Sequence, residues 1–330
     1  MLKYLLVVAG LFVTPILTSA HTRWFTEGTP LSLQITEPTV LYLCLLAITG
    51  LSLAILAITL HQKGRLSLNF LKPQKRHAFA RAAATFTMVT GAFFLIAGTH
   101  HYLFSPNLTA AAGIPNFLVY IQIAIGLSFL LGVITRFAAM ALGTIWFISF
   151  YYTGTVVTLE NIWVLGTALF IMVMGNDYFS IIGFSFLRHK LQEAYKHYAL
   201  SILRLSTGAT LLILGFSEKI LAPELGVGFL ATHHWNFMHS IGLDYSNYLF
   251  TLSAGTVEIL FGTIFILGVL TRLNALVVTI VFILPLFFLG PIELAGHLPH
   301  FASIILLMFF GNGGHFIPFK IHRDREPNPR

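Results

Sequence analysis

Glu258 is the residue whose type and position point most directly to chemistry. It lies near the middle of an apolar stretch, where inserting a charge into a bilayer costs about 2.5–3.5 kcal/mol. A carboxylate at such a position must be paired, protonated or turned toward a polar cavity. Lys219, at the end of the preceding apolar segment, is the expected partner. The pair could bind a proton or a quinone headgroup, or it could fix the register of two helices, and both readings stay open.

Glu218 and two histidines are expected on the same outer side of the membrane. His297 and His300 flank Pro299, and an i, i+3 pair can share one face of a helix. We therefore predict a polar pocket with Glu258 and Lys219 as its floor and the other three residues at its rim. The candidates for catalysis are Glu258, Lys219 and Glu218. The candidates for quinone contact are Glu258, Lys219, His297 and His300.

Other histidines on the predicted outer side raise an alternative, the binding of copper or zinc, because imidazole suits both metals. His21 would become the mature N-terminus after signal-peptide cleavage, so its free amine and its imidazole could chelate copper. No spacing in the set equals a recognised metal motif, and histidines are ordinary residues at a membrane interface. The candidate metal ligands are His21, His100, His101, His233, His234 and His239.

Composition places all of these residues in a membrane protein. Of the 330 residues, 56% are hydrophobic and 9% charged, and the mean hydropathy is +0.83, whereas soluble domains carry about 25% charged residues. The net charge of +7 does not indicate nucleic-acid binding, because the basic residues lie in loops between apolar segments. Cys44 is the one cysteine, so the chain alone cannot form a disulfide relay.

The N-terminal part of the chain predicts an orientation in the membrane. Residues 1–20 have the pattern of a signal peptide cleaved after Ala20, or alternatively of an uncleaved anchor. A short periplasmic segment (21–38) and a transmembrane helix (39–60) follow. The next segment, 61–81, is basic and contains no acid, which predicts a cytoplasmic loop.

One stretch of sequence occurs twice at an offset of 136 residues. Gln122–Arg136 and Glu258–Arg272 share a Gly-x5-Gly-x2-Thr-Arg frame, which indicates an internal duplication. We predict an all-α membrane protein with one leading transmembrane helix and two four-helix repeats, 82–176 and 204–314. Because each repeat has an even number of spans, the repeats should be parallel, related by an axis along the membrane normal.

The individual helices and connections can be placed approximately. The linker 177–203 is expected to form a basic amphipathic helix on the cytoplasmic face, as a docking site or as a topology anchor. The tail 315–330 is expected in the cytoplasm. The predicted helices are 82–97, 117–134, 137–152 and 156–174 in the first repeat, and 202–216, 248–270, 273–289 and 298–310 in the second.

A set of polar and glycine positions in the second half has a known counterpart. It comprises Arg204, Gly208, the run Gly215 to Lys219, Gly255, Glu258, Gly262, Leu267, Gly268, Thr271, Arg272 and the closing run Gly311 to Gly314. With these residues, the stretch from about 200 to 314 resembles the DoxX-like family of four-helix membrane proteins. The first half, about 80–176, looks like a diverged copy, in which Gln122 replaces Glu258 and His100-His101-Tyr102 replaces Ser217-Glu218-Lys219.

The resemblance implies a location and a general role. It implies a multi-pass protein of the bacterial inner membrane. Some relatives are subunits of quinone-linked sulfur oxidation, and most have no assigned activity. The predicted function is a membrane subunit of a quinone-linked or other redox pathway, working with a soluble or membrane redox partner. The alternatives are periplasmic copper or zinc handling by the outer histidines and a non-catalytic scaffold whose basic linker binds a partner.

Overall fold

The computed structural model describes residues 37–66, 68–75, 77–176, 178–180, 188–238, 242, 245–289 and 292–317. The predicted signal peptide, His21, His239 and most of the tail lie outside this part of the chain. The described residues are helical apart from turns, loops and one isolated β-bridge between Tyr102 and Thr109. The all-helical class predicted from the sequence therefore holds for them.

The helices follow one another with short connections. They are α2 (Glu37–Gln62), α3 (Ala78–Thr99), α4 (Asn116–Leu131), α5 (Thr135–Glu160), α6 (Ile162–Met174), α7 (Arg188–Leu214), the π-helix η4 (Gly215–Ile220), α8 (Pro223–His233), α9 (Asn247–Leu267), α10 (Thr271–Leu289) and α11 (Ile292–Phe310), with short 3-10 turns η2 (Asn69–Leu71) and η3 (Ala110–Ala112).

Several of these helices are long and apolar enough to cross a bilayer. Among the described residues there are five such segments: Thr39–Gln62, Ala78–Thr99, Thr135–Glu160, Gln192–Ile220 and Asn247–Leu267. Four shorter apolar helices accompany them. A helix forms hydrogen bonds between its own backbone N–H and C=O groups, and a segment that crosses the bilayer core needs such bonds because no water is present there. The chain is thus a multi-pass helical membrane protein by length and composition.

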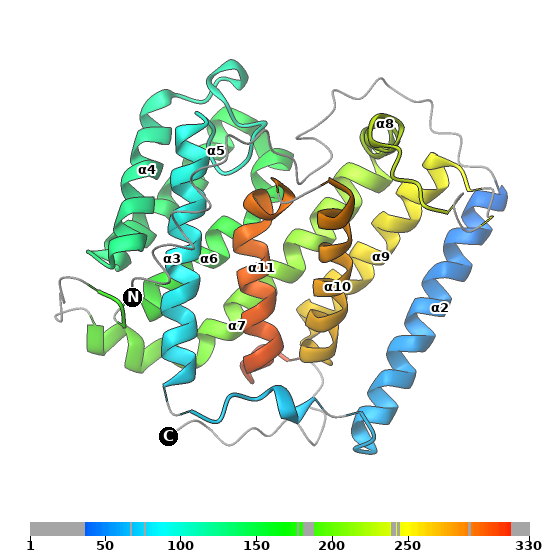
Figure 1. Cartoon of the computed structure of the whole chain (residues 1–330), viewed down its shortest axis with the longest axis horizontal. Coiled ribbons are helices and arrows are strands. Elements are labelled where there is room, and N and C mark those ends of the chain that lie inside the picture. Colours follow the sequence, from blue (N-terminus) through cyan, green and yellow to red (C-terminus); the bar gives the residue numbers. More distant parts are fainter. Residues whose placement is uncertain are drawn as a thin grey trace.

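The two halves of the bundle contact each other reciprocally. The first helix of each half packs against the last helix of the other: α3 against α11, and α7 against α6. Figure 1 shows α6, α7 and α11 in the middle of the molecule, with α3 and α4 on one side and α9 and α10 on the other. Helix α2 stands at the outer edge against α9 (Figure 1). Its hydrophobic side chains are largely exposed, as expected for a helix that faces lipid.

Unusual backbone angles recur at the offset of 136 residues. Gly132 and Gly268 end α4 and α9 in the left-handed conformation, with φ of 70° and 69°, a common helix ending. Two residues later, Ile134 and Leu270 have φ of 48° and 51°, although a positive φ is rare for β-branched and bulky residues. The turns that begin α5 and α10 therefore have the same backbone geometry.

Glycines bring α3 and α4, and likewise α7 and α9, into backbone contact. A Cβ atom built on Gly91 would lie 2.7 Å from the carbonyl oxygen of Gly126, and one built on Gly208 would lie 2.7 Å from that of Gly262. Burying leucine against leucine gains little over lipid tails, so small residues that permit close packing drive helix association in membranes. The contacts α3–α4 and α7–α9 use this device in the same way.

Replacing Gly262 with alanine is expected to lower the free energy of unfolding by about 1–3 kcal/mol, the usual cost of overpacking. The new Cβ would lie 2.6 Å from the carbonyl oxygen of Gly208 and 2.7 Å from the backbone nitrogen of Leu212. Gly143→Ala is the matched control, since its nearest neighbour would be Ala168 Cβ at 3.8 Å. Thermal unfolding in detergent should separate the two variants; an equal shift in both contradicts the packing described.

Three features between α5 and α8 differ from the sequence prediction. Helix α5 continues to Glu160 across a non-helical residue, Gly154 (φ 75°, ψ 179°), so α6 begins at Ile162 and not at 156. The predicted linker helix is the exposed beginning of α7 and not a separate surface element, because residues 188–207 contain no glycine or proline to interrupt it. Helix α8 was not predicted, although Pro223 at its start is a recognised signal.

Candidate functional site

An ion pair joins η4, which continues α7, to the middle of α9. Lys219 Nζ lies 2.8 Å from Glu258 Oε2, and the two side chains are 15% and 25% exposed. Two glycines make room for it: a Cβ built on Gly255 would lie 2.8 Å from Lys219 Cβ, and one built on Gly215 would lie 3.3 Å from Glu258 Cβ. The partner expected for Glu258 from the sequence is the partner found.

Lys219 lies in a stretch of π-helix. Residues Gly215–Ile220 have this form, and beyond them the N–H of Leu221 donates to the carbonyl of Phe216, five residues back, at 2.8 Å. π-helical turns are rare and are frequent at functional sites. The wider turn also carries Glu218, whose side chain is 1% exposed. Both charged residues of η4 are thus held by a specialised piece of backbone.

A third carboxylate, from the other half of the chain, acts electrostatically on this site. Lys219 interacts electrostatically with Glu258, Glu218 and, more weakly, Glu160. Glu160 ends α5 and is 5% exposed. The sequence analysis missed it, although Glu160 is the only acidic residue between positions 82 and 176. The site therefore combines one ammonium group with three carboxylates from both halves.

The first half has a neutral version of the same contact. Gln122 lies 136 positions before Glu258, and Tyr102 lies 117 positions before Lys219. Gln122 Nε2 donates to the Tyr102 carbonyl at 3.1 Å, and its Oε1 accepts from the Phe104 N–H at 3.0 Å. In each half, a polar side chain of the second helix fastens the end of the first. This contact between a polar side chain and the end of the preceding helix, here called the clamp, occurs in both halves. It is an ion pair in the second half alone.

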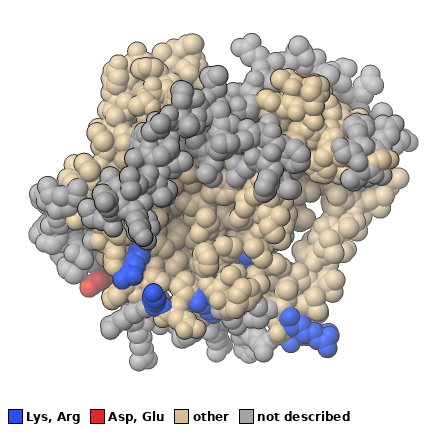
Figure 2. Space-filling model, viewed as in Figure 1, with Lys and Arg blue, Asp and Glu red and all other residues tan. Residues whose placement is uncertain are grey.

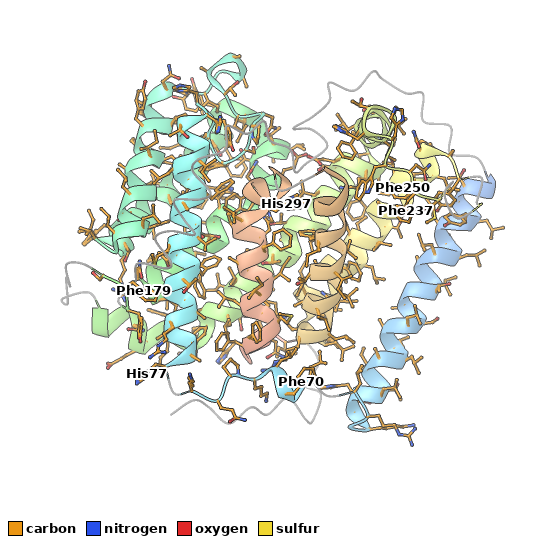
Figure 3. The ribbon with its side chains drawn as sticks, viewed as in Figure 1. Phe70, His77, Phe179, Phe237, Phe250 and His297 are labelled. Carbon is orange, nitrogen blue, oxygen red and sulfur yellow. The ribbon has the colours of Figure 1, made fainter. Side chains whose placement is uncertain are left out.

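The histidines of α11 do not form the open rim expected from the sequence. His300 is 6% exposed, and its ring centroid lies 5.2 Å from that of Trp163 on α6. His297, near the upper end of α11 in Figure 3, lies 5.5 Å from Phe282 on α10. The reason is that α11 begins at Ile292 and not at 298. His300 is therefore buried inside the helix bundle, whereas His297 is partly exposed.

The other candidate metal ligands lie at exposed helix ends. His100 and His101 follow α3, and His233 and His234 end α8. The ring centroid of His233 is 4.6 Å from that of Phe229. Within the described residues, no group of three or more His, Cys, Asp or Glu side chains is placed to hold a metal ion. His21 and His239 lie outside these residues, so the metal alternative stays a prediction of the sequence.

Comparison with protein-family models, with curated proteins and with solved structures gave no match.

The chemistry available at the site follows from its own residues. Lys219 is a strong hydrogen-bond donor, and the carboxylates can accept and release protons. Two apolar residues beside the pair, Phe216 and Leu221, are 43% and 68% exposed. In a bilayer, a hydrophobic molecule in the lipid could therefore approach the ion pair from the side.

Proposed function

We propose that this chain is a membrane subunit of a redox pathway and that its second half binds the headgroup of a quinone at Lys219 and Glu258. The observation that carries the proposal is a partly exposed ion pair, held by a π-helix, in an apolar helical bundle. A quinone is apolar except for its two carbonyl oxygens. Lys219 would donate a hydrogen bond to one oxygen, and the lipid-facing side of η4 would accommodate the ring and tail.

The carboxylates give the site a role in proton transfer. Reduction of a quinone to a quinol takes up two electrons and two protons. The electrons would come from a soluble or membrane redox partner, and protons would reach the quinone oxygens through Glu258, with Glu218 and Glu160 behind it. A buried acid in a membrane protein is a functional candidate by default. Here the neutral Gln122 clamp of the first half supports this reading, because holding the helices together needs no charge.

The proposal includes a DoxX-like architecture of two parallel four-helix repeats after the leading helix α2. The recurrent backbone angles at Gly132 and Gly268 and the reciprocal packing of α3 on α11 and α7 on α6 support it. We place the chain in a bacterial inner membrane with its basic end in the cytoplasm. Figure 2 shows Lys and Arg side chains gathered along the lower edge of the molecule, where α2 leads into α3, and such an excess is typical of the cytoplasmic side.

Quinone binding by purified protein in nanodiscs tests the proposal. We expect Glu258→Gln and Lys219→Met each to weaken the binding of a short-tailed ubiquinone analogue at least about ten-fold, the effect of losing one charge-assisted contact. Thr263→Val is the control, because Thr263 lies on the same helix and its hydroxyl donates to the Ile259 carbonyl. A folded Glu258→Gln variant with wild-type affinity would show that the pair serves only as a clamp.

A further inference from the structure

The turn between α9 and α10 borders a pocket at the end of the bundle opposite the ion pair. The pocket is lined by Gly268, Leu270, Thr271 and Arg272, by Asn312 after α11, and by His61 at the end of α2. The pocket belongs to no site assigned above, and it does not depend on the proposed quinone function.

The equivalent turn of the first half is covered by the chain itself. Ser180 Oγ donates to the Gly132 carbonyl at 2.7 Å, and a Cβ built on Gly132 would lie 2.6 Å from Ser180 Cα. The hydroxyl of Thr135 accepts a hydrogen bond from the Asn176 N–H at 3.4 Å. The Gly132 carbonyl and the Thr135 hydroxyl of that turn therefore have partners within the chain.

The second half leaves the matching hydroxyl without a partner. Thr271, the counterpart of Thr135, is 4% exposed, and its Oγ1 has no hydrogen-bond partner in the described part of the structure. An unpaired buried hydroxyl costs free energy, so such a group calls for an explanation. Because Thr271 also lines the pocket, a ligand held there would supply the missing partner.

The electrostatics of the pocket favour an anionic ligand. Thr271 and Arg272 begin α10, a helix of 19 residues, and the N–H groups and dipole of a helix N-terminus attract anions. Arg272 adds a partly buried cation, and none of the described lining residues is acidic. The ring of His61 is held by a hydrogen bond between its Nδ1 and the Leu66 carbonyl at 2.7 Å. Lys63 and Arg65 are exposed close by in sequence.

We propose that this pocket binds a phosphate group at the N-terminus of α10, with Arg272, the first N–H groups of the helix and the Thr271 hydroxyl as its ligands. Two sources carry this chemistry, the headgroup of an anionic phospholipid and phosphate in solution. The pocket lies where the apolar helices end, beside a basic segment, which is the level at which lipid phosphates lie and where basic pockets between helices bind them.

Native mass spectrometry of the full chain in detergent, titrated with phosphatidylglycerol, tests the lipid source. We expect Arg272→Gln to weaken binding about ten-fold, as for the loss of one charge-assisted contact, and Thr271→Val to weaken it by a smaller factor. Thr271→Val should not lower the melting temperature without lipid, because it removes a hydroxyl that has no partner. Arg65→Gln is the control, since it removes a charge from the same end without touching the pocket.

A second arm uses inorganic phosphate and thermal unfolding in nanodiscs of phosphatidylcholine. If phosphate stabilises the wild type, and if Arg272→Gln and Thr271→Val both reduce this stabilisation, the result supports the site and identifies phosphate in solution as the ligand. If both variants reduce the binding of phosphatidylglycerol while Arg65→Gln binds it as the wild type does, the result supports the site and identifies a lipid headgroup as the ligand. If both variants bind both probes as the wild type does, or if Arg65→Gln loses as much as Arg272→Gln, the proposal is wrong.

Discussion

Replacing Arg204 with methionine is expected to lower the free energy of unfolding by about 3–5 kcal/mol, the cost of breaking a buried charged network. The side chain is fully buried. Nη1 donates to the carbonyls of Phe265 and Ile266 at 2.8 and 2.9 Å, and Nη2 donates to those of His315 and Phe316, both at 3.0 Å. Methionine fills much of the same space but removes the donor of the Ile266, His315 and Phe316 carbonyls and leaves Phe265 with the Gly268 N–H alone, at 3.0 Å.

The reason for so large an effect is the position of these four carbonyls. Two belong to the last turn of α9, where a helix runs short of N–H groups of its own, although the Gly268 N–H also donates to Phe265. The other two belong to the segment after α11. Arg204 therefore fastens the end of α9 and the segment after α11 to α7. Gly268 is needed for this arrangement, because a Cβ there would lie 2.1 Å from Arg204 Nη1.

Equilibrium unfolding in mixed detergent micelles measures the effect, and Arg81→Met is the matched control. Arg81 is exposed, and its guanidinium carbon lies 5.0 Å from the centroid of the Tyr178 ring. Its loss should cost about 1 kcal/mol or less, as for an exposed cation–π contact. Equal losses in the two variants would contradict the role assigned to Arg204.

The second large effect is expected when Lys219 is replaced and Glu258 is kept. Lys219→Met removes the cation that pairs with the Glu258 carboxylate in an apolar bundle and that also interacts electrostatically with Glu218 and Glu160. We expect a loss of about 2.5–3.5 kcal/mol, the cost of an unpaired charge at membrane depth. The two side chains are only 15% and 25% exposed, so screening by solvent removes little of this cost.

The double variant Lys219→Met/Glu258→Gln should be more stable than Lys219→Met alone. It removes the unpaired charge of Glu258 and places a glutamine where the first half has Gln122. A double-mutant cycle from equilibrium unfolding would give the coupling between the two side chains. If the double variant is as unstable as the sum of the two single variants, the side chains do not act as a pair.

The fold was predictable where local signals were strong. The Gly-x5-Gly-x2-Thr-Arg frame correctly indicated a turn near Arg136 and near Arg272, but α4 and α9 end at Leu131 and Leu267, three residues before the predicted ends, because Gly132 and Gly268 end them in the left-handed conformation. The end of α5 and the start of α11 were wrong by several residues, because Gly154 interrupts α5 without ending it and because Pro299 lies inside α11 and not at its start. These outcomes depend on packing between helices, which a single sequence does not contain.

The site was predictable in its central pair only. An acid in an apolar span needs a partner, and Lys219 stood at the end of the neighbouring helix, so the contact followed from sequence. Glu160 was missed because it approaches from the other half through the packing of α6 on α7. Arg204 drew attention only as part of a resemblance, since a buried arginine cannot be told from an exposed one without its carbonyl partners.

Photo-crosslinking with an azido-quinone, followed by peptide mapping, is the most direct test of the central claim. In membranes that contain the wild-type chain, we expect label on residues 215–221 and 255–262, which carry the Lys219–Glu258 pair. Unlabelled ubiquinone should compete for it, and Glu258→Gln should reduce it. Label that falls elsewhere on the chain, or that stays on these segments undiminished in the folded Glu258→Gln variant, would contradict a quinone site at the ion pair.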